Sequence, residues 1–343
     1  MFVHQGHSVE RFNKLNKMNS LLPTILELVD LQTIADTIET TIAPSRSSKY
    51  AKLGRPAYPT LLMLKMVLLQ TLYNLSDEQT EYQCLDRLSF QHFLGLGPTD
   101  AIPDAKTLWL FKEKLGEHDM SHVIFDELQH QLHRHGYLPR GGQLVDASLV
   151  TAPVQRNSKE ENELIKSGAI PVDWSVYKRR QKDTEASWTK KNNTSYFGYK
   201  LSINVDKRDK FIRKVHVSTA KEHDSQHTQY LIDRCNTCRD WFADSAYVGE
   251  AVDRKLQENG MRPNIQRKGQ KGKPLSECQK RRNHRLAKSR CRVEHVFADF
   301  KAMGGKTIRT IGIGRAKLHL YLKSTMYNIR RLCTLQRQGY VPF

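Results

Sequence analysis

The sequence predicts an α/β protein in which a helical N-terminal part is followed by a domain of strands and helices. Two observations indicate this organisation. Residues 15–135 carry apolar side chains at helical spacing between short polar breaks. After Gly141-Gly142, apolar runs with a period of two alternate with helical patterns, which is typical of an α/β domain. Because 343 residues exceed what one compact core usually holds, we expect two domains.

The helical part is predicted from three segments with distinct signals. Residues 59–75 are apolar almost all round, as in a helix buried on most sides. Ser76 and Gln79 form a capping-box pattern that opens the next helix, and Pro103-Asp104 begins another. We therefore expect a helical bundle centred on residues 59–75.

The α/β part begins with a predicted strand at residues 144–150 that is mostly buried on both faces. Residues 199–205 alternate apolar and polar side chains, and residues 211–217 follow after a polar turn, which predicts a hairpin. Residues 155–198 are polar, basic and too long for an ordinary loop, so we interpret them as a surface insertion. The further predicted elements are helices at about 224–235, 250–259, 291–303 and 316–336, and strands at 241–243 and 262–266.

The charge of the chain indicates a polyanionic partner. Lys plus Arg number 55 and Asp plus Glu number 36, which leaves a net charge of +19. Eleven of the cations but only one acid lie between Arg267 and Arg292. Such a run is usually a solvated surface. Because this one leads into the helix that bears Glu294, we favour a salt-sensitive contact with a nucleic-acid backbone.

Composition also bears on the compartment. The longest apolar run, residues 61–75, is shorter than the roughly 20 residues that span a bilayer. Residues 1–14 lack the apolar core of a secretory signal, so we expect a cytoplasmic protein with no membrane partner. Cys235 and Cys238 have the spacing of half a zinc knuckle. Because no second pair follows, reduced thiols are favoured over a zinc site.

Three acids stand where the predicted elements would present them: Asp146 within the first strand, Asp244 at the end of a later strand, and Glu294 on a helix. Mg²⁺ prefers carboxylate ligands, and two ions roughly 4 Å apart can promote displacement at phosphorus. Taken singly, a turn cap is favoured for Asp244, and an ion-pair ladder with Arg290 and Lys301 for Glu294. For Asp146 a hydrogen-bonded strand residue and a site residue are equally favoured.

A set of short motifs occurs in a fixed order along nearly the whole chain: Gly54 to Pro59, Arg87 to Phe90, Phe93 to Leu96, Pro103-Asp104, Leu144 to Ser148, Trp188 to Lys191, Phe197 to Lys200, Glu222 to Asp224, Ala243 to Tyr247 and Arg290 to His295. Their ordered combination resembles the bacterial DDE transposases of the insertion-sequence-five family. The resemblance implies an RNase H-like mixed sheet flanked by helices, preceded by an all-helical N-terminal domain. It implies DNA-end binding by residues 1–135 and catalysis by residues 136–338, which carry the basic insertion at about 155–198.

The resemblance also implies a site. Asp146, Asp244 and Glu294 match the metal-binding triad, brought together from the first strand, the fourth strand and the following helix. The cofactor would be Mg²⁺, with Mn²⁺ as a substitute, at two ions per site. Arg290 and Lys301 match the cations around the family's glutamate. Where the related signature has a tyrosine three residues before the arginine, this chain has Ala287. The expected DNA contacts are Arg290, Arg292, Lys301, Lys200, Lys190 and Lys191.

Two of the quoted motifs have competing explanations. For His223-Asp224, a helix start with Asp224 as the N-cap is favoured over a catalytic dyad. Lys200 and Tyr247 are explained equally well as DNA contacts or as an edge cation and a packed aromatic with a polar tip.

The function implied by the resemblance is transposition of an insertion sequence. The enzyme would hydrolyse the phosphodiester at each transposon end and join the freed 3′-hydroxyl to target DNA. Its partners would be double-stranded DNA, as terminal inverted repeats and as target, and at least a second copy of the chain. It would be cytoplasmic and nucleoid-associated when bound. The alternatives are a two-metal endonuclease without strand transfer and a catalytically silent DNA-binding protein.

Overall fold

The computed structural model describes residues 10, 13–14, 18, 21–42, 56–97, 99–270 and 272–342. Gly54 and Arg55 of the first motif lie outside the described residues. The chain forms two compact units, Met1–Tyr137 with Tyr321–Phe343, and Leu138–Leu320. This division is one of compactness alone, so the functional assignment of residues 1–135 and 136–338 stays a prediction.

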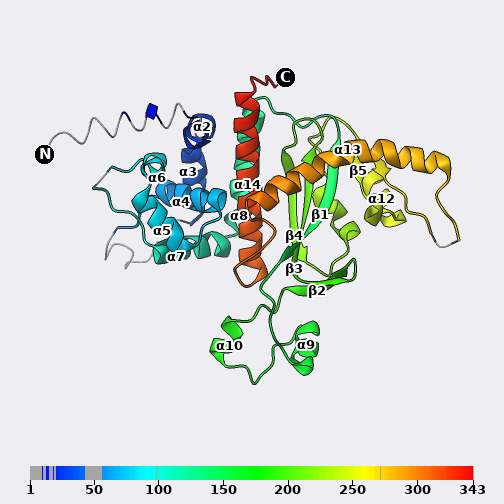
Figure 1. The fold of residues 1–343 in the computed structure, drawn as a ribbon, viewed down its shortest axis with the longest axis horizontal. Helices are drawn as coiled ribbons and strands as arrows, with labels where there is room; N and C mark the ends of the chain where they lie inside the picture. The colour runs from blue at the N-terminus through cyan, green and yellow to red at the C-terminus, as the bar shows by residue number, and fades with distance from the viewer. Residues whose placement is uncertain are drawn as a thin grey trace. The chain divides into compact units, whose positions relative to one another are not determined.

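The first unit is helical, as predicted (Figure 1). The described helices are α2 (Leu21–Leu28), α3 (Leu31–Ile42), α4 (Thr60–Tyr73), α5 (Asp77–Asp86), α6 (Leu88–Leu94), α7 (Ala105–Glu117), α8 (Met120–Arg134) and the later part of α14 (Ile313–Arg337). Nine residues of α4 are buried, which confirms the buried helix. The capping box of Ser76 and Gln79 at the start of α5 and the Asp104 cap of α7 are also confirmed. None of the described helices combines the length and apolarity needed to cross a membrane.

A buried lysine closes the C-terminal end of α4. Lys323 is 1% exposed, and its Nζ donates to the carbonyl of Thr71 at 2.8 Å and to Asn74 Oδ1 at 3.2 Å. Asn74 ends α4 in the left-handed conformation, with φ of 55°. An ammonium group at this position compensates carbonyl groups that have no partner within the helix and the negative end of the helix dipole.

The second unit is built on a mixed six-stranded sheet, which confirms the predicted α/β class. Strand β1 is antiparallel to β3 and parallel to β5; β3 is antiparallel to β2 and β4; and β5 is parallel to β6. The strands are β1 (Gln143–Thr151), β2 (Ser187–Lys191), β3 (Thr194–Asp206), β4 (Ile212–Thr219), β5 (Asp240–Ala243) and β6 (Arg262–Ile265). The helical elements are α9 (Lys159–Lys166), α10 (Val176–Arg180), η3 (Asp224–His227), α11 (Thr228–Leu231), η4 (Ser245–Tyr247), α12 (Glu250–Glu258), α13 (Glu277–Ala302) and the start of α14.

The predicted insertion is only partly separate from the sheet. Helices α9 and α10 project beyond the sheet in Figure 1, but residues 187–191 form β2, which pairs with the start of β3. The turn between these strands is Asn192-Asn193, both with positive φ. An Asn pair in a two-residue hairpin turn is a recognised signal for such a connection. The prediction that residues 187–198 lie outside the sheet is therefore wrong.

Two helices differ from their predicted lengths. The helix expected at 224–235 is a 3-10 turn followed by the short α11, which ends at Leu231. Helix α13 begins at Glu277, not at residue 291, after a capping box formed by Ser276 and Gln279. Its first half has one buried side chain, Leu286, so apolar periodicity gives no signal there.

Candidate carboxylate and cation site

Asp146 and Asp244 come from neighbouring parallel strands. Leu144 of β1 pairs with Phe242 of β5, and each aspartate lies two residues beyond its member of that pair. Paired positions of neighbouring parallel strands lie side by side, so these equal offsets bring the two carboxylates to one place. The negative charge of Asp244 contributes to raising the pKa of Asp146, as expected of close neighbours.

Burial is the main influence on Asp146. Desolvation raises the pKa of its carboxyl to about 6, and the charges of Asp244 and Asp224 act in the same direction. The guanidinium of Arg290 and the backbone N–H of Ala147 oppose this rise. Arg290 Nη2 lies 3.5 Å from Asp146 Oδ2. Arg290 is therefore the ion-pair partner of Asp146, and its charge offsets part of the repulsion from the neighbouring acids.

Asp244 also caps a turn, which is the role that the sequence favours when this residue is considered singly. It is the N-cap of η4, where its Oδ1 accepts a hydrogen bond from the N–H of Ala246 at 2.9 Å. The cap fixes the carboxylate at the end of β5. Tyr247 in the same turn is fully buried against Trp241, with ring centroids 5.4 Å apart. Its packed-aromatic interpretation is thus confirmed.

Helix α13 presents Arg290 and Glu294 in different ways. The helix crosses the sheet in Figure 1 and packs through its apolar residues, which include Val293 and Phe297. Arg290 pairs with Asp146 and donates from Nη1 to Gln266 Oε1 at 2.5 Å. The sequence favours an ion-pair ladder of Arg290 with Glu294 within the helix, but Arg290 instead forms its ion pair with Asp146 of β1.

Glu294 lies one turn after Arg290, and its side chain is exposed. Within the described part of the chain, one trio of potential metal ligands lies within 4.8 Å of each other, and it consists of His216, Glu222 and His227. The structure thus brings Asp146, Asp244 and Arg290 together and places Glu294 on the adjoining helix. Three elements, η4, α12 and β6, separate β5 from α13 in the chain, so α13 is not the helix that directly follows Asp244.

A lysine that sequence reasoning missed borders this site. Lys306 Nζ donates to the hydroxyl of Ser148, two residues beyond Asp146 on β1. Burial and the nearby charges of Lys191 and Lys301 lower the pKa of Lys306, whereas Asp146 raises it. Lys306 therefore lies beside Asp146, and Lys191 and Lys301 lie close to Lys306. Lys306 follows Gly304-Gly305 outside any quoted motif, so no local signal distinguished it.

The other predicted DNA contacts differ in exposure. Lys190 and Arg292 are exposed, and Arg292 also donates to the carbonyl of Lys207 at 2.8 Å. Lys200 is buried, forms an ion pair with Asp224 at 2.7 Å, and donates to the carbonyl of Glu222. Its ammonium group is thus engaged inside the protein. His223, not Asp224, is the N-cap of η3, so the preferred cap assignment was wrong by one residue.

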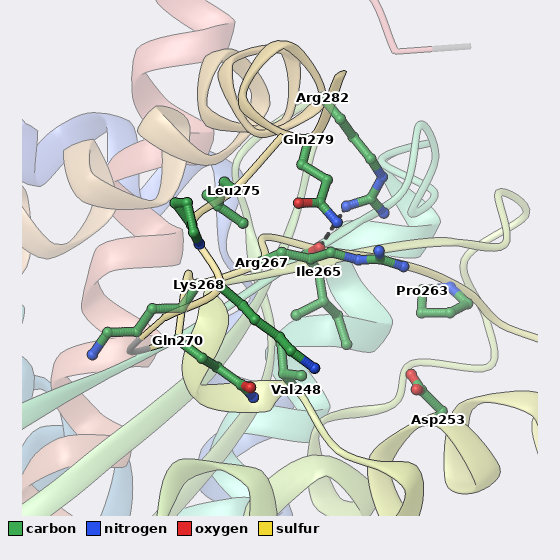
Figure 2. A pocket seen from close by; sticks show the side chains of 12 residues that line it. Val248, Asp253, Pro263, Ile265, Arg267, Lys268, Gln270, Leu275, Gln279 and Arg282 are labelled. Atoms are coloured by element: carbon green, nitrogen blue, oxygen red, sulfur yellow. Dashed lines mark hydrogen bonds between the residues drawn. The ribbon is translucent and has the colours of Figure 1, made fainter. Parts of the chain in front are cut away.

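The basic segment between residues 267 and 292 forms part of a pocket of about 520 Å³ (Figure 2). Four cations and one acid line it, contributed by the loop after β6, the first turns of α13, and α12. Arg282 is tied to this wall by donating to the carbonyl of Ile265 at 2.8 Å. The charged lining residues are Arg267, Lys268, Lys273, Arg282 and Asp253. The surplus of cations favours an anionic occupant such as a phosphate group.

Neighbouring aspartates, one within β1 and one directly after β5, with Lys306 beside them, fit the class of enzymes that act on nucleic-acid phosphates with metal ions. Residues 164–329 match the family described as "Transposase DDE domain", and residues 10–114 match "Transposase domain (DUF772)". These matches support a DDE transposase with an RNase H-like catalytic domain, an enzyme that binds and cleaves DNA in transposition and uses divalent metal. Asp244 and Glu294 lie inside the first matched range, and Asp146 lies between the two ranges. No solved structure matches the chain at a significant level.

Proposed function

We propose that this protein is an insertion-sequence transposase of the insertion-sequence-five family. It cleaves the phosphodiester at each transposon end and then joins the freed 3′-hydroxyl to target DNA at the same site. The observation that carries the proposal is the partly buried Asp146, within β1, beside Asp244, which directly follows the neighbouring parallel strand β5. The two transposase domain matches support it.

The donor chemistry of this site fits divalent metal ions. Asp146 is partly buried next to a second carboxylate, and the guanidinium of Arg290 lies 3.5 Å from it. Oxygen ligands with excess negative charge are what Mg²⁺ requires. In the proposal Asp146, Asp244 and Glu294 hold two Mg²⁺ ions, for which Mn²⁺ can substitute. When bound, these ions would activate the attacking oxygen and stabilise the leaving one.

The remaining residues of the site position DNA. Arg290 orients Asp146 and partly offsets its charge. Lys306 lies beside Asp146 and close to Lys191 and Lys301, where the phosphates flanking the scissile bond would pass. Exposed Lys190 and Arg292 extend this cationic surface. The N-terminal helices would recognise the terminal inverted repeats, and two ends require at least a dimer.

Reaction with linear DNA that carries the parent element's ends tests the proposal. With Mg²⁺ we expect both cut and joined products on a gel, and with EDTA we expect neither. Cut products without joined ones would favour the endonuclease. Binding without any product would favour the silent DNA-binding protein.

The lysines close to Lys306 lead to a separate prediction about how DNA affinity depends on salt concentration. If Lys191 and Lys301 each neutralise one phosphate, the Lys191→Gln/Lys301→Gln variant should lower the slope of log affinity against log salt by about 2. The slope is measured by DNA-binding titrations at several salt concentrations.

Lys214→Gln is the matched control for this pair. Lys214 is exposed on β4 and pairs with Asn204, whose neighbour Ile203 is the partner of Asp146. Alternation along β3 therefore places Lys214 on the opposite face from Asp146. Equal slopes for the parent and the double variant would contradict phosphate contacts by Lys191 and Lys301.

A further inference from the structure

A second group of metal-ligating side chains lies on the other face of the sheet. His216 on β4, Glu222 after β4 and His227 at the end of η3 offer ligand atoms that all lie within 4.8 Å of one another. We propose that these three residues bind one Zn²⁺ ion, with water as the fourth ligand. This site is independent of the carboxylates that we assign to DNA chemistry.

The strand register separates the two sites. His216 pairs with Ser202, and Ser202 pairs with Ala147 of β1. Side chains of directly paired residues share a face, and successive residues alternate between faces. The imidazole of His216 therefore lies on the same face of the sheet as the side chain of Ala147. Asp146 precedes Ala147 by one residue, so its side chain lies on the opposite face.

His227 is held ready for a ligand on its second nitrogen. It is 1% exposed, and its Nδ1 lies 2.8 Å from the hydroxyl of Ser202. Its Nε2 is buried without a hydrogen-bond partner and lies 3.5 Å from Glu222 Oε2. This contact to Glu222 is too long for a strong hydrogen bond, and metal ligation would give the nitrogen a closer partner. Hydrogen bonding of the other nitrogen is how proteins usually orient a ligating histidine.

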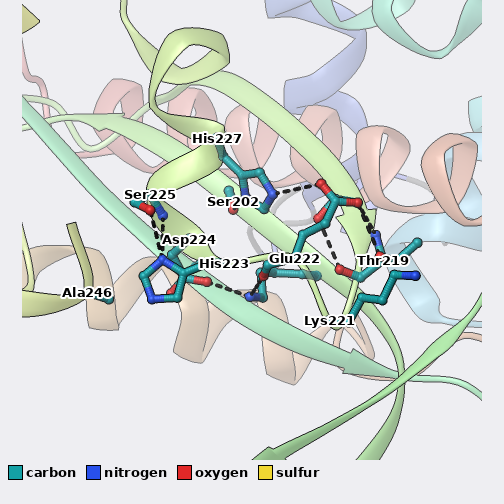
Figure 3. Close-up of polar contacts among 12 residues, drawn as sticks. Ser202, Thr219, Lys221, Glu222, His223, Asp224, Ser225, His227 and Ala246 are labelled. Atoms are coloured by element: carbon teal, nitrogen blue, oxygen red, sulfur yellow. Dashed lines mark hydrogen bonds and ion pairs between the residues drawn. The ribbon is translucent and has the colours of Figure 1, made fainter. Parts of the chain in front are cut away.

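Glu222 is oriented toward His227 by its other oxygen. Glu222 Oε1 lies 3.2 Å from Thr219 Oγ1, and Figure 3 shows the carboxylate spanning between Thr219 and His227. Bonds of about 2.0–2.1 Å in a tetrahedral zinc site place neighbouring ligand atoms roughly 3.3 Å apart. The 3.5 Å between Glu222 Oε2 and His227 Nε2 already fits that spacing.

His216 completes the set from a well-supported position. Its ring stacks on Tyr230, with centroids 4.3 Å apart and planes within 1° of parallel, and lies 4.8 Å from the ring of His227. Burial favours the neutral form of both imidazoles, which is the form that binds metal. Two imidazoles and one carboxylate are a recurrent zinc ligand set. The side chain of Glu222 is 38% exposed, which gives the ion and its water access from solvent.

Zinc at this position would connect η3 to β4. Asp224 of η3 pairs with Lys200 and is close enough to raise the pKa of Asp146. The ion would therefore stabilise the segment that carries Asp224 beside the carboxylate site.

Metal titration of the full chain tests this inference. All measurements use the Cys235→Ser/Cys238→Ser background, because thiolates also bind zinc. We expect one Zn²⁺ per chain by calorimetry, a rise in the melting temperature, and visible absorption of tetrahedral Co²⁺ when Co²⁺ replaces it. Glu222→Gln and His216→Ala should each weaken Zn²⁺ binding by about 100-fold or more, beyond what loss of an outer partner costs.

His284→Ala is the matched control, since His284 is exposed, lies on α13 and is not one of the trio. It should bind Zn²⁺ like the parent, and so should Asp146→Asn. Circular dichroism verifies that each variant is folded. Absence of stoichiometric Zn²⁺ binding would overturn the inference. Binding that survives Glu222→Gln and His216→Ala, or that disappears with Asp146→Asn, would overturn it as well.

Discussion

The Asp146→Asn variant is expected to lose DNA-end cleavage while it still binds the ends. The substitution keeps the size of the side chain but removes the partly buried charge that would hold a divalent ion at β1. Loss of one charged group that acts at the reacting phosphate costs roughly 10³-fold in rate or more. Cleavage rates on gels and end binding by mobility shift measure the two properties separately.

Glu258→Gln serves as the control for charge removal. Glu258 is an exposed residue at the end of α12, outside the proposed site. Its variant should cleave at the parent rate. Full activity in Asp146→Asn would refute the assignment of Asp146. Loss of both cleavage and binding would show that Asp146 supports the fold and not the reaction.

Gly198→Ala is expected to cause the largest loss of stability among single substitutions in the sheet. Gly198 has φ of +151°, and an added Cβ would lie 2.1 Å from the carbonyl oxygen of Val150 and 2.8 Å from the N–H nitrogen of Ala152. Both atoms belong to the backbone, so β3 and β1 would have to separate. We expect a loss of about 3 kcal/mol or more in the free energy of unfolding, measured by urea denaturation.

Gly168→Ala isolates the effect of crowding. Gly168 also has positive φ, +86°, but no heavy atom lies within 4 Å of its added Cβ. This variant should lose only about 1 kcal/mol, the cost of left-handed backbone for a residue with a side chain. Equal losses in the two variants would contradict close strand approach as the reason for glycine at 198.

Much of the fold could be predicted because its signals are local. The all-round apolar pattern of residues 59–75 and the capping box of Ser76 appear in the structure where the sequence predicts them. The alternation over residues 199–205 correctly indicates β3 and its hairpin with β4. The first half of α13 and strand β2 escaped prediction, because their polar faces carry no apolar period.

The candidate site, unlike the fold, could not be predicted from local patterns in the sequence. Spacing alone favoured a cap for Asp244 and a ladder for Glu294, and only the ordered motifs joined them to Asp146. The resemblance placed three acids together. The structure brings two of them side by side, one within β1 and one directly after β5, adds Lys306, and turns Arg290 toward β1. The assignment of Glu294 as the third metal ligand remains a proposal, which Glu294→Gln would test alongside Asp146→Asn.

The sequence by itself determined the class of the fold, most of its elements, and the cationic character that points to nucleic acid. Tertiary structure alone decided which side chains meet: Asp146 with Asp244 and Arg290, and His216 with Glu222 and His227. The reason is physical. Periodicity reports that an element buries one face, whereas strand order and register, which no local pattern encodes, determine what that face and its edges contact.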